Sequence, residues 1–235
     1  MKNKVIAHRG AWKEFNLPQN SIASLQKAIE LQCIGSEIDV HLTKDDFIVV
    51  NHDHDFYGLP IENTNYSDLL SKTHPNGEKL TLLVEFFKQI NNQNTTKLIV
   101  EIKTSQISPK RTQKLIDILT EQIPLKTTVQ NTEFILFDFA AAIYLKKQLP
   151  LFHVHYLEGD KTAQQIFESG LNGMDYPFDL LLKNPEIIRE FKKMYLQTNT
   201  WTVNNLEVAH QLIAQGIDFI TTDYPQFFMR NDGMH

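Results

Sequence analysis

Short apolar runs alternate with segments of helical periodicity along almost the whole chain, and this alternation restricts the fold more than any other feature. Strands are expected at residues 4–7, 36–40, 97–103, 132–137, 151–156, 171–176, 195–203 and 217–222. Apolar residues at helical spacing separate most of these runs, for example from Ile22 to Ile29 and from Val208 to Ile213, where Asn205 is the expected helix cap. About eight strand–helix units in 235 residues predict an α/β fold, a (β/α)8 TIM barrel.

A doubly wound open sheet has the same alternation and is the alternative fold. The first expected strand is not followed by a Gly-rich dinucleotide loop, which counts against this alternative. Residues 54–80 lack clear periodicity and contain several Gly, Pro and Asn residues, so they form a long excursion between regular elements. Because no interdomain linker is apparent, we expect one domain over residues 1–235.

The composition is that of a soluble protein with a sizeable core, since 42% of the residues are apolar. The formal net charge of −5 provides no basic field for nucleic acid or an anionic membrane. No apolar run approaches the ~20 residues of a membrane span, and the first residues leave no room for a signal peptide. We therefore expect a cytoplasmic location without membrane insertion, and a buried, reduced thiol at Cys33. Nothing specifies an oligomeric state.

Two carboxylates lie two residues apart in a largely apolar run, at Glu37 and Asp39. Residues at this spacing share one face of a strand, and Glu101 recurs on the next expected barrel strand. An exposed strand edge with ordinary acids is the alternative. Inside a barrel, however, unpaired carboxylates are costly, and three of them without a thiolate suit one hard cation, Mg²⁺ or Ca²⁺, better than zinc.

Further polar residues follow the expected strands at the end where barrel enzymes build their sites. His8 and His52 each end an apolar run, and together they suggest an acid and a base. Arg9 and Lys103 suit phosphate binding, although they also neutralise the acids. Trp201 either lines the pocket or fills the barrel mouth. This combination predicts a site for a phosphodiester.

Other histidines are weaker candidates. His41 has the outward parity of its strand and is expected to be exposed or packed, and His54 is expected to have a loop role. His153 and His155 share one face of the fifth expected strand. They either line the barrel or form a satisfied pair in the core.

An ordered series of motifs over essentially the whole chain resembles the glycerophosphodiester phosphodiesterase family. The series consists of His8-Arg9-Gly10, Pro18-Gln19-Asn20-Ser21, Glu37-Ile38-Asp39-Val40, Thr43-Lys44-Asp45, Val49-Val50-Asn51-His52-Asp53, Glu101-Ile102-Lys103, Trp201-Thr202-Val203-Asn204 and Thr222-Asp223-Tyr224-Pro225. Each motif alone is weakly specific, whereas the ordered series is strongly specific.

This resemblance implies a barrel with a small insertion after the second strand, matching residues 54–80. It implies a metal-dependent enzyme that hydrolyses glycerophosphodiesters to glycerol 3-phosphate and an alcohol. The implied roles are metal ligation by Glu37, Asp39 and Glu101, general acid–base catalysis by His8 and His52, and substrate binding by Arg9, Lys103 and Trp201. The implied cofactor is one divalent cation, Mg²⁺ or Ca²⁺, and the implied partner is a small-molecule glycerophosphodiester.

The sequence departs from the family pattern at Gln19, where the family usually has Glu, so one negative charge near the site is missing. The usual Gly is Asp46 and the usual Pro is Leu80, and both changes are expected to affect only turns. Two alternative functions are a lysophospholipase D-like phosphodiesterase acting on a larger lipid and a non-catalytic barrel that binds a phosphodiester.

Overall fold

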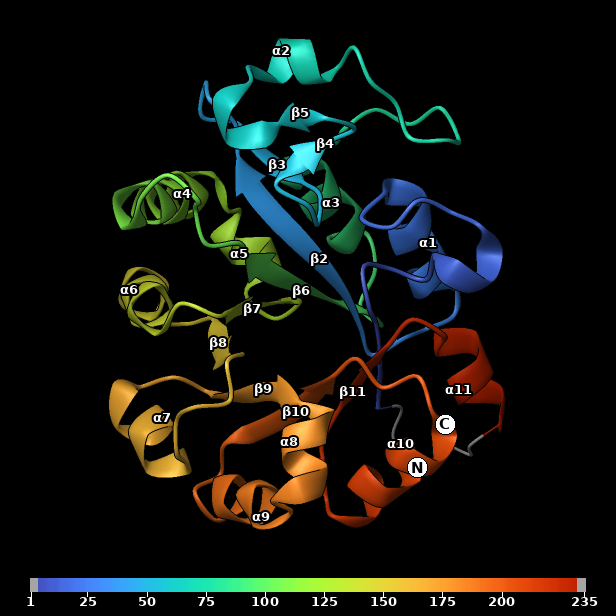
Figure 1. The fold of residues 1–235 in the computed structure, drawn as a ribbon, viewed down its shortest axis with the longest axis vertical. Coiled ribbons are helices and arrows are strands. Elements are labelled where there is room, and N and C mark those ends of the chain that lie inside the picture. The colour runs from blue at the N-terminus through green and yellow to red at the C-terminus, as the bar shows by residue number, and fades with distance from the viewer. Residues whose placement is uncertain (1–3, 232–235) are drawn as a thin grey trace.

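The computed structural model describes residues 4–231 (backbone only at 126, 127 and 231) and shows a nearly closed parallel barrel inside a ring of helices (Figure 1). The predicted (β/α)8 fold is thereby confirmed, while the predicted domain bounds, 1 and 235, lie outside the described residues. In spatial order the barrel strands are β10 (Gln197–Trp201), β9 (Gly173–Pro177), β8 (His153–Tyr156), β7 (Thr132–Leu136), β6 (Lys97–Ile102), β2 (Gly35–Leu42), β1 (Val5–Ala7) and β11 (Ile220–Thr222).

Main-chain hydrogen bonds beside β10 and β11 bring the two ends of the sheet together. The Phe219 amide donates to the Thr198 carbonyl at 3.1 Å, and the Val203 amide donates to the Thr221 carbonyl at 2.9 Å. Inside the barrel, apolar side chains from four strands and adjoining segments form one cluster around Ile6, Ile99 and Ile135. Buried polar side chains, among them Asp175 and Asn199, line a small cavity next to this cluster.

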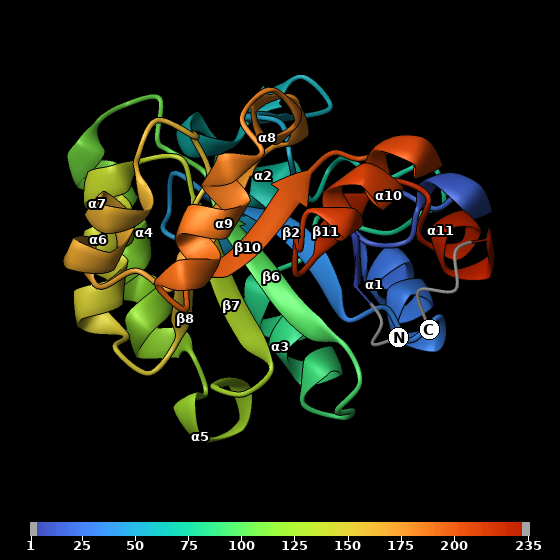
Figure 2. The ribbon, with the colours of Figure 1, turned by 90° about the horizontal axis from the view of Figure 1, so that it is seen from below.

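Helices cover the outside of the barrel, as Figure 2 shows from a second direction. They are α1 (Ile22–Glu30), α3 (Leu83–Ile90), α4 (Pro109–Gln122), α5 (Leu125–Thr128), α6 (Phe139–Gln148), α7 (Ala163–Ser169), α8 (Phe178–Lys183), α9 (Glu186–Lys193), α10 (Leu206–Ala214) and α11 (Pro225–Asn231). Asn205 caps α10 as predicted, because its side chain accepts hydrogen bonds from the Glu207 and Val208 amides. Helices α5, α8 and α11 were not predicted, since four to seven residues show little periodicity.

Several strands begin later than the apolar runs indicate. The expected strands at 151, 195 and 217 begin at His153, Gln197 and Ile220. Leu151 and Tyr195 lie in the preceding turns with 77% and 98% of their surface exposed, so their apolar character does not mark a strand. Cys33 is buried and free, in agreement with the prediction. Within residues 4–231, no helix combines the length and the apolar character needed to cross a membrane.

The excursion after β2 folds into small elements with a core of their own, beyond one side of the barrel in Figure 1. It contains β3 (Ile48–Val50), which pairs antiparallel with β2, then β4 (Asp55–Phe56), β5 (Leu59–Pro60), the 3₁₀ helix η2 (Ile61–Asn63) and α2 (Tyr66–Leu69). Its core consists of Val49, Phe56, Ile61, Leu69 and Leu80. Elements of two to four residues explain why the sequence shows no periodicity here.

A buried carboxylate attaches this insertion to the barrel. Glu62 accepts hydrogen bonds from the Ser105 hydroxyl at 2.6 Å and the Gln106 amide at 2.9 Å, and it lies 3.3 Å from the Arg111 guanidinium. These contacts connect the insertion to the loop between β6 and α4. His52 lies between β3 and β4, and the preceding Asn51 amide donates to the Asp39 carbonyl on β2 at 3.0 Å.

Candidate active site

The structure brings together the three acids that the sequence singles out. Asp39 on β2 and Glu101 on β6 are opposite each other in the parallel register, and Glu37 lies two residues before Asp39. One carboxylate oxygen from each acid lies within 4.8 Å of the other two, and all three side chains are buried. The i, i+2 alternation of β2 thus points both of its acids into the barrel mouth.

The electrostatics of this cluster favour a bound cation. Burial, together with the neighbouring charges of Asp39 and Glu101, raises the pKa of Glu37 well above its usual range. Burial and the charge of Asp39 raise the pKa of Glu101 to about 7. Burial acts in the same sense on Asp39, but Lys103 and other cationic or donor groups outweigh it and lower the Asp39 pKa. Three buried carboxylates with an oxygen-only donor set fit a hard divalent ion.

Two cations already lie against the acids. Lys103 Nζ is 2.7 Å from Glu101 Oε1 and 3.2 Å from Asp39 Oδ1. Arg9 Nε is 3.8 Å from Asp39 Oδ2, and the Arg9 amide donates to Glu37 Oε2 at 2.8 Å. The interpretation that these cations neutralise the acids is therefore correct, and it is compatible with phosphate binding because the guanidinium and the ammonium also line the open pocket.

The turn after β1 sets the position of Arg9. Arg9 has a φ of 56° and Gly10 a φ of 82°, and a Cβ atom on Gly10 would lie 2.3 Å from the Ser24 hydroxyl. Only glycine fits this approach to α1 without a shift. The Arg9 side chain is then held by Gln19, whose Oε1 accepts from Arg9 Nη1 at 2.9 Å. Gln19, the departure from the family pattern, therefore contacts the guanidinium rather than the three acids.

Asn20 is a site residue that sequence reasoning missed, because an Asn beside a helix start looks like an ordinary entry residue. It is buried, its Nδ2 donates to Asp39 Oδ2 at 2.8 Å, and its Oδ1 accepts from the Asp39 amide at 2.9 Å. Ser21, the next residue, is the N-cap of α1. Asn20 thus fixes the orientation of one proposed metal ligand from an adjacent loop.

Replacement of Asn20 with alanine is expected to reduce both stability and the affinity for a divalent ion. It leaves a buried carboxylate oxygen and a buried amide without their partners, which costs about 1–3 kcal/mol each. Asn16→Ala is the matched control, because Asn16 also has a left-handed backbone (φ 52° against 56°) but an exposed side chain. Thermal unfolding with and without Mg²⁺ measures both effects. An equal decrease in melting temperature in the two variants would mean that the Asn20 side chain contributes nothing specific and that only backbone conformation matters.

His8 follows β1 and is held by an aspartate after β11. His8 Nδ1 lies 2.7 Å from Asp223 Oδ1, and Asp223 Oδ2 accepts from Asn204 Nδ2 at 2.9 Å and from Lys13 Nζ at 3.2 Å. Although burial works against the charge, His8 and these other donors hold the pKa of Asp223 well below its usual range. An ionised Asp223 favours a proton on Nδ1, which leaves Nε2 of His8 for chemistry.

His52 has a similar arrangement on the other side of the pocket. Its Nδ1 is 2.8 Å from Asp53 Oδ1, and burial lowers its pKa. The His52 carbonyl lies 3.2 Å from His41 Nε2. His41 is buried, so of the two outcomes expected for it the packed one is correct. Both pocket histidines thus direct one ring nitrogen to a carboxylate.

The predicted site residues line one pocket, except for Asp39, which is buried against Asn20 and Lys103. The lining includes His8, Arg9, Glu37, His52, Glu101, Lys103 and Trp201. Trp201 forms an apolar wall with Phe137, at 5.6 Å between ring centroids, and its Nε1 donates to the Asp175 carbonyl at 2.8 Å. Trp201 lines the pocket and also packs against the apolar cluster inside the barrel, so both positions expected for it are found.

Asp175 on β9 is a second buried acid that sequence reasoning missed. It lines the same pocket, its Oδ1 has no hydrogen-bond partner among the described residues, and burial raises its pKa to about 8. The strand alternation from Gly173 could have placed it inside the barrel. Without a neighbouring motif, however, one acid in a strand gives no signal in the sequence.

The polar end of this barrel is suited to the hydrolysis of a phosphodiester, and comparison with known proteins identifies the class. The model of the glycerophosphoryl diester phosphodiesterase family matches residues 8–227. The chain therefore belongs to this family, which confirms the resemblance and the predicted enzyme class, a phosphoric diester hydrolase. A non-catalytic binding barrel is accordingly not the function of this chain.

Relatives match over nearly their whole length. A glycerophosphodiester phosphodiesterase of Caldanaerobacter subterraneus subsp. tengcongensis is 28% identical over 246 residues, which cover 96% of both chains. The crystal structure of a glycerophosphodiester phosphodiesterase from Parabacteroides distasonis superposes with a TM-score of 0.92 at 34% identity, covering 98% of this chain and 97% of that one. An Oleispira antarctica phosphodiesterase, solved with its product sn-glycerol-3-phosphate, shares the fold (TM-score 0.80, 22% identity, 97% and 95% coverage).

Proposed function

We propose that the protein hydrolyses glycerophosphodiesters to glycerol 3-phosphate and an alcohol, with one divalent cation, Mg²⁺ or Ca²⁺, as cofactor. The observation that carries this proposal is the convergence of two carboxylate-paired histidines, three buried acids and two cations on one pocket. Support also comes from the Oleispira phosphodiesterase, whose structure contains sn-glycerol-3-phosphate.

In this proposal Glu37, Asp39 and Glu101 hold the cation. A hard divalent ion supplies charge neutralisation and polarises a phosphoryl oxygen when it is bound. Arg9 and Lys103 bind the phosphate, since both line the pocket while contacting the acids. Trp201 contacts the carbon part of the substrate with the face that lines the pocket.

The two histidines exchange protons with the substrate. One imidazole takes the proton of the substrate's glycerol hydroxyl, and the resulting oxygen attacks phosphorus. The other imidazole protonates the departing alcohol oxygen, which leaves a cyclic phosphate. Water then opens the ring with the two roles reversed, so both histidines return to their starting states.

The structure gives no support to the lysophospholipase D-like alternative. That alternative expects apolar residues of the insertion to receive an acyl chain. Phe56 and Ile61, however, are fully buried in the insertion's own core, where they pack with Val49, Leu69 and Leu80. The insertion also contains Tyr57, which is exposed, and Leu59, which is half-buried against the same core. A compact diester without an acyl chain is therefore the better fit.

A substrate panel tests the proposed function. Glycerophosphocholine and glycerophosphoethanolamine are expected to release glycerol 3-phosphate, detected with a coupled dehydrogenase, whereas lysophosphatidylcholine is expected to react far more slowly. A chelator should abolish turnover, and added Mg²⁺ or Ca²⁺ should restore it. Faster turnover of lysophosphatidylcholine would favour the larger lipid, and full activity in chelator would contradict a metal-dependent reaction.

A further inference from the structure

A second cluster of potential metal ligands lies at the other end of the barrel. Glu133 is the second residue of β7, and His153 and His155 are the first and third residues of β8. In the parallel register Glu133 is opposite His153 and also opposite Ile99, two residues before Glu101 on β6. The cluster is therefore at the amino ends of the strands, away from the pocket described above.

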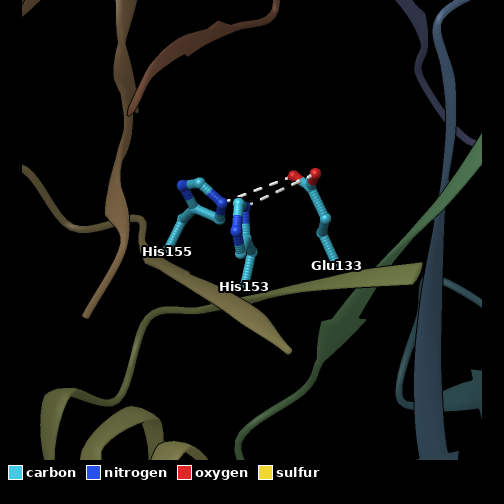
Figure 3. Close-up of side chains that lie close together, drawn as sticks. All are labelled: Glu133, His153 and His155. Carbon is cyan, nitrogen blue, oxygen red and sulfur yellow. Dashed lines mark ion pairs between the residues drawn. The ribbon is translucent and has the colours of Figure 1, made fainter. Parts of the chain in front are cut away.

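The three side chains point toward one another, as Figure 3 shows. His155 Nε2 is 3.4 Å from Glu133 Oε2, and His153 Nδ1 is 3.8 Å from Glu133 Oε1. One potential ligand atom from each residue lies within 4.8 Å of the other two. Ligands around a tetrahedral ion at about 2.0–2.1 Å are separated by roughly 3.3 Å, whereas N–H···O hydrogen bonds span about 2.7–3.2 Å. The observed separations resemble those of ligands that share an ion.

His155 provides an independent observation. The residue is 4% exposed, and its Nε2, 3.4 Å from Glu133 Oε2, makes no hydrogen bond to any residue that the structure describes. A buried polar atom without a partner is costly. A simple ion-pair cluster, the alternative explanation, would satisfy this nitrogen by a hydrogen bond. Lys97 already pairs with Glu133 Oε1 at 2.5 Å, which leaves Oε2 facing His155.

We propose that Glu133, His153 and His155 bind a divalent transition-metal ion of the zinc type at the amino end of the barrel. Two imidazoles and one carboxylate suit such an ion, whereas Mg²⁺ and Ca²⁺ prefer the all-oxygen set at the other end. The side chain of His153 is 52% exposed and lines a surface pocket together with Glu133, so water has access as a fourth ligand.

Burial and neighbouring groups affect the ionisation of these side chains. Burial opposes the charge of Glu133, but His155 and Lys97 outweigh it and lower the pKa of this carboxyl to about 2. Burial lowers the pKa of His153. The amino end of such barrels contributes to stability rather than catalysis, so the ion would connect β7 and β8 as a structural element.

The test uses the full chain, stripped of metal by a chelator and kept in excess Mg²⁺ so that the acids at the other end are occupied. Equilibrium dialysis with Zn²⁺ is expected to show one bound equivalent, and added Co²⁺ is expected to give the intense visible absorption of a four-coordinate ion. His153→Ala and His155→Gln are expected to weaken zinc binding by more than about tenfold. Mutation of residues that only hydrogen-bond to a metal ligand already lowers metal affinity by about 10–100-fold, and loss of a ligand should cost at least as much.

His210→Ala is the control, since His210 is an exposed histidine on α10. It is expected to keep the zinc equivalent and the rise in melting temperature that zinc produces. If His155→Gln fails to fold, the half-exposed His153→Ala variant decides alone. Unchanged zinc binding in His153→Ala, complete displacement of zinc by Mg²⁺, or a weak six-coordinate cobalt spectrum would each overturn the proposal.

Discussion

Replacing His52 or His8 with alanine is expected to reduce kcat by about 10²–10⁴-fold, the usual contribution of one acid–base group. This corresponds to about 3–5 kcal/mol of transition-state stabilisation. The reason is geometric, because each imidazole is held through Nδ1 by a carboxylate, at 2.7 Å for His8 and 2.8 Å for His52. Neither ring belongs to the apolar core, so circular dichroism should show an intact fold while turnover of glycerophosphocholine is lost.

A substrate with a better leaving group should separate the two roles. Glycerophospho-p-nitrophenol needs little protonation of its leaving oxygen. The first step, followed as release of p-nitrophenol in a single turnover, is therefore expected to recover in the variant that lacks the acid of that step, and not in the variant that lacks the base. His210→Ala, at an exposed position on α10, controls for the removal of a histidine. Near wild-type turnover of glycerophosphocholine by either pocket variant would refute its assignment.

The sequence predicted the barrel and the grouping of the acids for one physical reason. Parallel strands end at a common edge, and side chains at i and i+2 share a face. Glu37, Asp39 and Glu101 could therefore be placed together before any coordinates were known, and the register of Asp39 opposite Glu101 agrees with this. The apolar runs also located every barrel strand, with boundaries shifted by up to three residues.

The residues that support the site could not be predicted in the same way. Asn20 contacts Asp39 across 19 positions of sequence, from a left-handed loop residue whose neighbours read as a helix start. Asp175 belongs to no recognisable sequence motif. Only its burial beside the pocket identifies it as a candidate site residue. Contacts of this kind depend on how loops pack over the barrel, and periodicity contains no information about that packing.

Glu37→Gln is expected to abolish activation by Mg²⁺ or Ca²⁺ and to reduce turnover by at least about 10²-fold, since a bound ion contributes several kcal/mol to the transition state. The substitution keeps the shape of the side chain. It also keeps an oxygen that can accept the hydrogen bond from the Arg9 amide, which is 2.8 Å long to Glu37 in the wild type. It removes a buried carboxyl group whose pKa is raised by burial and by the charges of Asp39 and Glu101, so that its ionised form is unfavourable without a bound ion. The metal-free variant is therefore expected to melt at the same temperature as the wild type or higher.

In Glu37→Gln, turnover should thus fall while the melting temperature of the metal-free protein stays the same or rises. A variant that simply failed to fold would lose both. Addition of Mg²⁺ or Ca²⁺ should raise the melting temperature of the wild type by preferential binding to the folded state, and it should leave Glu37→Gln unchanged. Glu85→Gln makes the same chemical change on α3, at a side chain that is 42% exposed, and should behave like the wild type. If Glu37→Gln still gained turnover and thermal stability from the added ion, the three acids at the barrel mouth would not be its ligands.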